Sequence, residues 1–241
     1  MTPIDMGDGT GTLGQGGLRN VSTFIGAIPD SVVYQWRTED FADPWPSNIG
    51  NSEMSISGLT ASGDLVSGDG NDDHGLASGP ETLPTNETHG VAFTFGTTVS
   101  SVSFAWGMED ADNTRFQLRV QDDGAIRITY DDGTNGLEVA TDTAFNDGTV
   151  RACVINKSGN AAADIDIYVG DMSTAVTTST LDDAAFDHTQ YSPASQMGYW
   201  ARNNEGTPDL NIDADQGVFE FNSEPYSQSD REGFVSRRSE V

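Results

Sequence analysis

Two short turns in this sequence hold the side chains best suited to binding a cation. The first covers residues 68–74 and the second covers residues 109–113, and both are rich in side-chain oxygens. Carboxylate and amide oxygens are the ligands that hard cations such as Ca²⁺ and Mg²⁺ prefer. We therefore expect no required cofactor but a possible Ca²⁺ or Mg²⁺ site, with solvated turn acids as the alternative. The candidate ligands are Asp69, Asn71, Asp72, Asp73, Asp110 and Asp112.

The residues that could act in catalysis form no recognisable motif in the sequence. Asp213 and Asp215 would share one face of a strand, and two neighbouring carboxylates can serve glycoside hydrolysis. With 38 acids in the chain, however, such pairs are expected by chance. A zinc site needs converging ligands, whereas the three histidines stand far apart, and Cys153 lies in an apolar run typical of a core residue. We expect that the protein is not an enzyme.

Tryptophan rings could stack on sugars, and two of them are candidates for doing so. Trp45 lies between Pro44 and Pro46 in an expected loop, which makes it the candidate most open to solvent. Trp200 follows an apolar stretch and could be either exposed or buried. We name Trp45 and Trp200 as candidate glycan-binding residues, with packing over the edge of the fold as the alternative.

The charge of the chain is strongly unbalanced. Asp and Glu outnumber Lys and Arg by 38 to 11, and the formal net charge is -27 over 241 residues. Such a surface repels itself in dilute buffer, but at about 1 M salt the Debye length falls to about 3 Å and the repulsion is screened. The composition resembles that of halophiles that accumulate salt, chiefly haloarchaea and their viruses, and a merely acidic protein is the alternative. The acidic field also argues against nucleic acid, which is bound by clustered Lys and Arg.

Short apolar runs alternate with turn signals from residue 28 onward. Residues 116–120 and 125–130 alternate between apolar and polar side chains, as half-buried strands do, and the Asp-Asp-Gly sequence at 122–124 is typical of a hairpin turn. Residues 150–156 are expected to pair with residues 164–169. Regularly spaced short strands predict an all-β, antiparallel two-sheet jelly-roll sandwich. One short helix is expected over residues 227–237.

The first 27 residues differ in composition from the rest of the chain. They are rich in Gly and cannot bury much surface, so we expect a flexible or assembly arm at 1–27 and a single domain at 28–241. A disordered tail is the alternative. We expect neither a secretory signal nor membrane insertion, because no basic region precedes an apolar stretch and no segment approaches about 18 apolar residues. The candidate assembly residues of the arm are Gly11, Leu13, Leu18 and Arg19.

Several motifs follow one another in a recognisable order over about residues 28–235. An apolar strand at 32–36 precedes Trp45 and a Gly-Asn turn at 50–51, the turn GDGNDDH occupies 68–74, and strand-like segments at 197–200 and 216–221 close the order. This order resembles that of laminin-G-like jelly rolls in the concanavalin A-like lectin and glucanase superfamily, whose turn is F-D-G-x-D-D-Y. Gly68 and His74 depart from it. The resemblance implies two curved sheets and, as in some members, Ca²⁺ at the sheet rim. The Glu-x-Asp-x-x-Glu strand of the superfamily's glycosidases is absent.

The resemblance and the charge together suggest a role. Domains of this superfamily usually act outside cells, and a chain made in the host cytoplasm without a signal peptide reaches the outside when lysis releases a virus particle. We therefore expect a non-enzymatic structural protein at the surface of the virion of a haloarchaeal tailed virus, as a capsid decoration or turret or as a tail or fibre component. Expected partners are identical copies in a homo-oligomer, other virion structural proteins, and host surface glycans or the S-layer glycoprotein. A soluble carbohydrate-binding module of a haloarchaeon is the alternative, and a glycoside hydrolase is the less favoured one.

Overall fold

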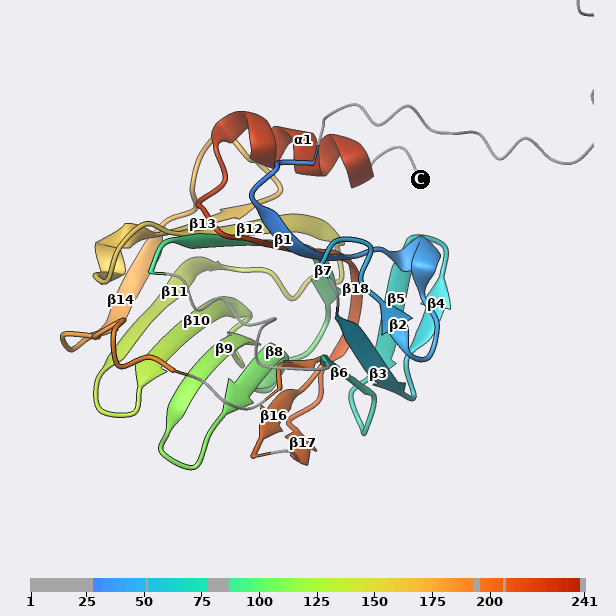
Figure 1. Ribbon diagram of the computed structural model, residues 1–241, viewed down its shortest axis with the longest axis horizontal. Coiled ribbons are helices and arrows are strands. Elements are labelled where there is room, and N and C mark those ends of the chain that lie inside the picture. Colours follow the sequence, from blue (N-terminus) through green and yellow to red (C-terminus); the bar gives the residue numbers. More distant parts are fainter. Residues whose placement is uncertain (1–27, 51, 78–86, 193–195, 206, 239–241) are drawn as a thin grey trace, which may run out of the picture.

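Two β-sheets lie face to face in the computed structural model, which describes residues 28–50, 52–77, 87–192, 196–205 and 207–238 (Figure 1). Within these residues sheet A has seven strands and sheet B has eleven, and all strand pairs run antiparallel except that between β16 and β8. This arrangement confirms the all-β jelly-roll sandwich predicted from the sequence.

The strands of each sheet follow an order different from that in the chain, as a jelly roll requires. Sheet A runs β13 (Ile165–Val169), β12 (Arg151–Lys157), β7 (His89–Thr97), β18 (Asp213–Asn222), β5 (Leu65–Asp69) and β4 (Thr60–Ser62), with β1 (Val32–Trp36) paired to β18. Sheet B runs β14 (Thr178–Asp183), β11 (Gly136–Ala144), β10 (Ala125–Asp132), β9 (Thr114–Val120), β8 (Ser103–Glu109), β15 (Gly198–Tyr199), β6 (His74–Ala77), β3 (Glu53–Ser57) and β2 (Trp45–Pro46). A hairpin of β16 (Arg202–Asn204) and β17 (Thr207–Asp209) lies beside β8.

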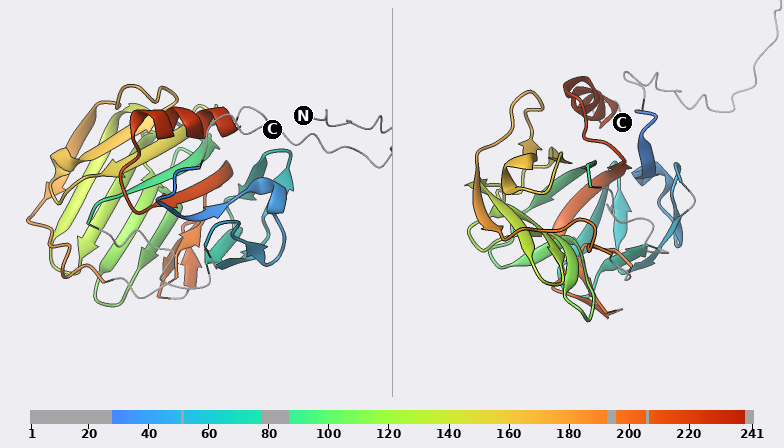
Figure 2. Two further views of the ribbon diagram at one scale, coloured as in Figure 1. Left: turned by 45° about the horizontal axis from the view of Figure 1, so that its top comes forward. Right: turned by 60° about the vertical axis from the view of Figure 1, so that its left-hand side comes forward.

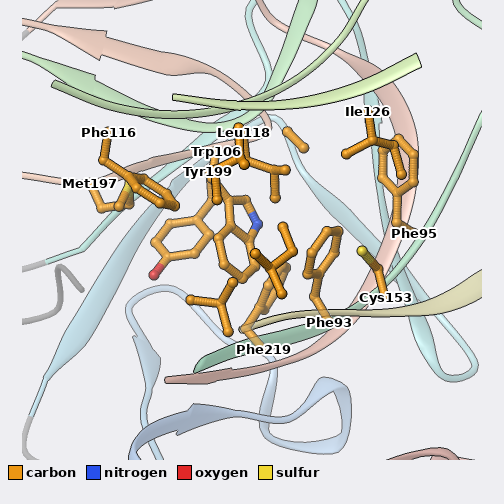
Figure 3. Packing of buried hydrophobic residues seen from close by; sticks show 14 of the residues in the cluster. Phe93, Phe95, Trp106, Phe116, Leu118, Ile126, Cys153, Met197, Tyr199 and Phe219 are labelled. Carbon is orange, nitrogen blue, oxygen red and sulfur yellow. The ribbon is translucent and has the colours of Figure 1, made fainter. Parts of the chain in front are cut away.

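Side chains from both sheets fill the space between them, and Trp106 of β8 lies within this core (Figure 3). Its ring is fully buried, with its centroid 4.7 Å from that of Phe93 in sheet A and 5.4 Å from that of Tyr199 in sheet B. Its Nε1 donates a hydrogen bond to Oε1 of Gln216, which satisfies the one polar atom of the ring. Tilted ring pairs at such spacing add about 0.5–1.5 kcal/mol beyond burial. Aromatic packing therefore joins the two sheets into one core.

Alternation in the sequence decides which face of a strand is buried. In β9, Phe116 and Leu118 belong to the core, while Gln117 and Arg119 lie on the outer face of the sheet. Gly124, in the turn to β10, has a φ of 84°, a left-handed conformation that glycine adopts without steric cost. The hairpin predicted there is confirmed, and so is the pairing of residues 150–156 with 164–169, which form β12 and β13.

The predicted C-terminal helix is confirmed as α1 (Gln228–Arg238), which lies over the outer face of sheet A (Figure 2). At its start, Ser227 Oγ accepts a hydrogen bond from the backbone N–H of Asp230, whose carboxylate accepts one from the N–H of Ser227. Phe234 is buried against sheet A, and the Arg231 guanidinium lies 3.8 Å from the centroid of the Tyr168 ring. No helix in the described part of the chain has the length and apolar character to cross a membrane.

Four strands of sheet B lie where none is expected from the sequence: β11, β14 and the short strands β2 and β17, of which β2 occupies the expected loop around Trp45. Five of the six residues of β14 are exposed, so its sequence carries no apolar alternation. β11 does alternate, with buried Leu137 and Val139, and this pattern could have indicated a strand. The predicted arm lies outside the described residues, and with it Gly11, Leu13, Leu18 and Arg19.

Candidate functional site

Neither tryptophan named for glycan binding is open to solvent, which corrects the expected exposure of Trp45 and settles the open alternatives for Trp200 in favour of burial. Trp45 is fully buried, with its ring edge-on to Phe219 at 5.9 Å and its Nε1 donating a hydrogen bond to the carbonyl of Arg37 at 3.0 Å. Trp200 is fully buried as well, edge-on to the same Phe219 at 5.3 Å, and its Nε1 donates to the carbonyl of Ala214. Burying a large aromatic side chain is worth about 1.5–3 kcal/mol. Both indoles are therefore part of the core, and stacking on a sugar would require them to leave it.

The first predicted cation turn does bring its acids together. Carboxylate oxygens of Asp69, Asp72 and Asp73 lie within 4.8 Å of one another at the turn between β5 and β6. Both oxygens of Asp69 accept hydrogen bonds from Asn71, which lower the pKa of Asp69, and Asp73 Oδ2 accepts one from the Asp69 backbone at 2.8 Å. The carboxylates thus organise their own turn. Three acids could supply part of the six to eight oxygens that Ca²⁺ takes, and cation binding there stays a prediction.

The second predicted cation turn is held by local hydrogen bonds. Asp112 Oδ1 accepts one from the backbone of Thr114 at 2.9 Å, and the backbone N–H of Asn113 donates to the carbonyl of Asp110. Asp110 and Asp112 belong to no converging group of three acidic, histidine or cysteine side chains in the part of the chain that the structure describes. The structure therefore does not bring them together as metal ligands.

Among the described residues, the two acids and the cysteine considered for catalysis are not arranged for it. Asp215 Oδ1 accepts a hydrogen bond from Ser67 Oγ at 2.5 Å, while Asp213 is exposed at the start of β18. Cys153 is buried in the core, and burial raises the pKa of its thiol, so a thiolate is disfavoured. Within the described residues the only converging triad of potential ligands is that of the Asp69 turn.

One end of the sandwich is closed by a buried cluster around Lys157. Its Nζ donates hydrogen bonds to the carbonyl of Glu87 at 2.7 Å and to Oδ1 of Asn160 at 2.9 Å. The same Nζ lies 5.7 Å from the centroid of the Tyr130 ring and 5.4 Å from that of Phe186, a cation–π arrangement. Because the side chain of Lys157 is fully buried, this cluster is a structural closure of the core.

Basic side chains gather on the outer face of sheet B. Of the eight basic residues whose side chains the structure describes, four project there: Arg115 and Arg119 from β9, Arg127 from β10 and Arg202 from β16. The register sets Arg119 opposite both Phe104 of β8 and Arg127 of β10. We call the outer surface of β8–β11 with these four arginines the arginine face.

Two arginines of this face share one carboxylate. Glu138 of β11 accepts from Arg119 through Oε2 and from Arg127 through Oε1, both at 2.9 Å, and from Thr129 Oγ1 at 2.7 Å. The pKa of the Arg119 guanidinium is lowered by burial, and the nearby Glu138 opposes that shift. Like charges directly opposite on neighbouring strands normally repel, and here the shared carboxylate offsets that repulsion.

The network continues across β9 to the hairpin beside β8. Arg119 Nη1 donates to Gln117 Oε1 at 2.6 Å, and Gln117 Nε2 donates to Glu109 Oε2 at 3.0 Å. Arg202 reaches Glu109 and Asp209, both at 2.7 Å. A continuous chain of hydrogen bonds therefore links β11 to β16 and fixes the orientation of these side chains.

An aromatic ring is clamped within the arginine face. Phe104 is only 3% exposed, and its centroid lies 5.8 Å from the guanidinium of Arg119 and 5.3 Å from that of Arg202. A Cβ at Gly107 would lie 3.1 Å from Phe104 and 3.2 Å from Arg202, so a larger residue there would require these side chains to shift by a few tenths of an ångström. Arg115 adds an ion pair of 2.8 Å to Asp131. The result is a polar surface of mixed charge whose side chains are held by ion pairs and hydrogen bonds.

The arginine face was not expected from the sequence, although a signal is present there. Only 11 Lys and Arg occur in the chain, yet Arg115, Arg119 and Arg127 fall within 13 residues. They also occupy the polar positions of two correctly predicted strands. A search for clustered bases on one strand face, rather than for acids, would have indicated this surface.

The fold of this chain is similar to that of solved structures, although its sequence matches no known family. No protein-family model matches this sequence, and no curated protein sequence matches it. Solved structures do: a Trypanosoma rangeli sialidase in complex with sialic acid is similar, with a TM-score of 0.65 and 10% identity over 88% of this chain and 34% of that one. The receptor-binding domain of a botulinum neurotoxin C/D mosaic serotype is similar with a TM-score of 0.63 and 12% identity, over 86% of this chain and 51% of that one.

These likenesses define a fold class. The matched proteins contain jelly-roll sandwiches, and this chain is a sandwich of the same kind. At 10–12% identity the likeness shows the fold alone. The chain spans about half the length of the toxin chain and about a third of that of the sialidase.

Proposed function

We propose that this chain is a non-enzymatic structural and recognition domain that works in concentrated salt. Its particular place, in this proposal, is the surface of the virion of a haloarchaeal tailed virus, as a capsid decoration, turret, or tail or fibre component. It assembles there with identical copies and other virion proteins, and it meets host surface glycans or the S-layer glycoprotein.

The proposal rests on the acidic surface of the protein. Its few described basic side chains are paired with carboxylates or buried, so most carboxylates at the surface have no basic partner. Six of the eight basic residues whose side chains the structure describes are paired with carboxylates. The other two, Lys157 and Arg231, are buried and donate to backbone carbonyls. Solvent therefore meets an excess of unpaired carboxylates, which suits a protein whose self-repulsion is screened by salt.

Absence of enzymatic activity is part of the proposal. Most glycoside hydrolases use two carboxylates that flank the scissile bond, although sialidases use a Tyr nucleophile. In the described part of the chain Asp213 and Asp215 join no larger acidic group, and Asp215 accepts a hydrogen bond from Ser67. The sialidases among the similar structures are enzymes by their names, but this chain covers only 34% of the sialidase compared above.

Mass spectrometry of purified particles tests the placement. Particles from a lysed culture that encodes this chain should contain it in constant ratio to the major capsid protein through successive density gradients. Genes for capsid, portal and tape-measure proteins beside its gene are also expected. Recovery of the chain only from the cells or the culture fluid, with none in the banded particles, would falsify the virion placement.

A soluble carbohydrate-binding module is the second candidate. It is favoured by the kind of fold, since one similar structure holds sialic acid and another is a receptor-binding domain by name. Glycan-array binding by a monomer in concentrated KCl would support this candidate. With Trp45 and Trp200 buried, such a module would have to use polar groups and not these rings.

A further inference from the structure

The buried end of β12 holds the only lysine of the chain beside a fixed asparagine. Lys157 is the last residue of this strand, and the turn that follows places the side chain of Asn160 against its amine. Two hydrogen bonds hold that turn: the N–H of Ser158 donates to the carbonyl of Asp164 at 2.8 Å, and the N–H of Ala161 donates to the Asp164 carboxylate at 3.0 Å. Asn160 is therefore kept in place beside the amine.

The contacts of Asn160 orient its amide toward two different partners. Lys157 Nζ donates a hydrogen bond to Oδ1 of Asn160 at 2.9 Å, and Nδ2 of Asn160 donates one to Oε1 of Glu87, also at 2.9 Å. An ammonium only donates hydrogen bonds and a carboxylate only accepts them, so these partners fix which end of the amide each one meets. Because a C=O bond is about 1.23 Å long, Nζ lies no more than about 4.1 Å from the amide carbon Cγ. The amine thus lies next to an electrophilic carbon, and the amide nitrogen lies next to a carboxylate.

The surroundings of Lys157 favour its neutral, nucleophilic form. The side chain is fully buried, and its Nζ lies 5.7 Å from the centroid of the Tyr130 ring and 5.4 Å from that of Phe186. Burial lowers the pKa of Lys157 to about 8, while Glu87 and Asp164 oppose the shift. Desolvation of this kind activates lysine amines as nucleophiles. Glu87 is exposed, so a small molecule released beside it reaches solvent.

We propose that Lys157 and Asn160 form an intramolecular isopeptide bond, with Glu87 as the group that transfers the proton. The lone pair of neutral Nζ adds to Cγ of Asn160, a bond between Nζ and Cγ forms, and the bond between Cγ and Nδ2 breaks. The proton that Nζ gives up passes through the Glu87 carboxylate to Nδ2, which leaves as ammonia. A lysine that starts as the ammonium first loses one proton to solvent. Nothing is oxidised or reduced in this step.

This inference goes beyond the proposed function and does not depend on it. The reaction occurs once in each chain, so it is a self-modification and not enzymatic turnover. It exchanges a buried positive charge for a neutral amide, and it ties the end of β12 to the turn before η3 (Ala162–Asp164). Arginine supplies every other strong base of the chain, and a guanidinium stays protonated and could not react in this way. The bonded chain has no titrating amine at residue 157, so unfolding experiments on that amine need chain of full mass.

Intact-mass spectrometry of the full chain tests this inference. Held folded at pH 9 in 3 M KCl, the chain should lose about 17 Da, the mass of the ammonia released. Trypsin should then leave the backbone after Lys157 uncut and yield one peptide of residues 152–202 with the same deficit, because the amine that it recognises is gone. Chain held at the same pH in concentrated urea should keep its full mass, since the fold positions the reacting groups.

Three variants separate the roles of these groups. Lys157→Met has no amine and should keep its full mass. Glu87→Gln should react about 100-fold more slowly or less readily still, because proton transfer by a positioned side chain contributes about 10²–10⁴-fold. Glu224→Gln makes the same exchange at an exposed glutamate outside this cluster and should react as the original chain does. Circular dichroism checks that each variant is folded, and the original chain carries the main test without any of them.

A folded chain that keeps its full mass at pH 9 overturns the inference. So does a deficit of about 17 Da in chain that trypsin still cuts after Lys157, because closure of Asn160 onto its own backbone also releases ammonia. If Glu87→Gln reacts as fast as the original chain, the part of the inference that gives Glu87 the proton transfer is overturned.

Discussion

At the scale of one residue, the lowered pKa of Lys157 makes the free energy of unfolding depend on pH as long as its amine is free. Burial lowers its pKa to about 8 from the ordinary value of 10.5, while Glu87 and Asp164 oppose the shift. Between pH 8 and pH 10.5 the unfolded chain therefore binds more protons at this site than the folded chain. Because stability rises with pH wherever the unfolded state binds more protons, Lys157 makes the protein more stable as pH rises through this window.

Lys157→Met should remove this pH dependence. From pH 8 to pH 9.5 the original chain should gain about 1.5 kcal/mol of unfolding free energy from this group, and the methionine variant should gain none of it. The range ends below pH 10 because buried Tyr130, Tyr191 and Tyr199 have raised pKa values and would reverse the trend there. Urea unfolding at constant KCl and several pH values measures the effect. Equal slopes for the two proteins would show that Lys157 is charged in the folded state over the whole range.

Backbone strain in the connection from β14 to β15 can be tested at the scale of an element. Ala185, exposed just after β14, has a φ of 54°, which costs an L-residue about 1–2 kcal/mol. Ala185→Gly should relieve this cost and, after the loss of chain entropy, stabilise the protein by about 0.5–1 kcal/mol. Thermal unfolding in 3 M KCl is the measurement.

Ala161 serves as the control for this prediction. Its replacement by glycine shows the effect of glycine at a position without a left-handed backbone. Ala161 has a φ of -105°, which any residue adopts, so Ala161→Gly should destabilise by about 0.5–1 kcal/mol. If both glycine variants lower the melting temperature alike, the left-handed conformation at Ala185 is not a source of strain.

Most elements with a buried face were predicted from the sequence, with β11 as an exception, whereas the exposed strand β14 was not. The alternation of apolar and polar residues in β9 indicates a half-buried strand, and the structure has it. β14 offers no such pattern because it lies exposed at the sheet edge. Trp45 was expected to be exposed because only its proline neighbours could be read from the sequence. The ring of Phe219, which packs against it, belongs to a distant strand and leaves no trace in those neighbours.

Distance along the chain also decides which candidate sites could be predicted. Asp69, Asp72 and Asp73 converge because they are neighbours in one turn, which sequence alone can indicate. The arginine face unites residues nearly 90 positions apart, from Arg115 to Arg202, and needs the pairing of β16 with β8. Arg115, Arg119 and Arg127 are a local signal, but the pairing that adds Arg202 to them carries none.

For the whole molecule the dominant prediction concerns salt. With a net charge of -27, repulsion among carboxylates opposes folding in dilute buffer and is screened as the Debye length falls to about 3 Å near 1 M salt. The urea concentration at the unfolding midpoint should therefore rise steeply between 0.1 M and 3 M KCl. Asp30→Asn, Asp122→Asn and Asp213→Asn together change the net charge from -27 to -24, and this variant should reach half folding at lower KCl.

These three carboxylates are suitable because each is exposed, so their replacement alters charge more than structure. Asp→Glu at the same three positions keeps the charge at -27 and serves as the matched control, which should need as much KCl as the original chain. If charge repulsion sets the salt requirement, only the asparagine variant moves. A chain with the same unfolding midpoint in dilute buffer as in 3 M KCl would remove the physical basis for a halophilic origin, and with it the reason to look for this protein in a virus of brine.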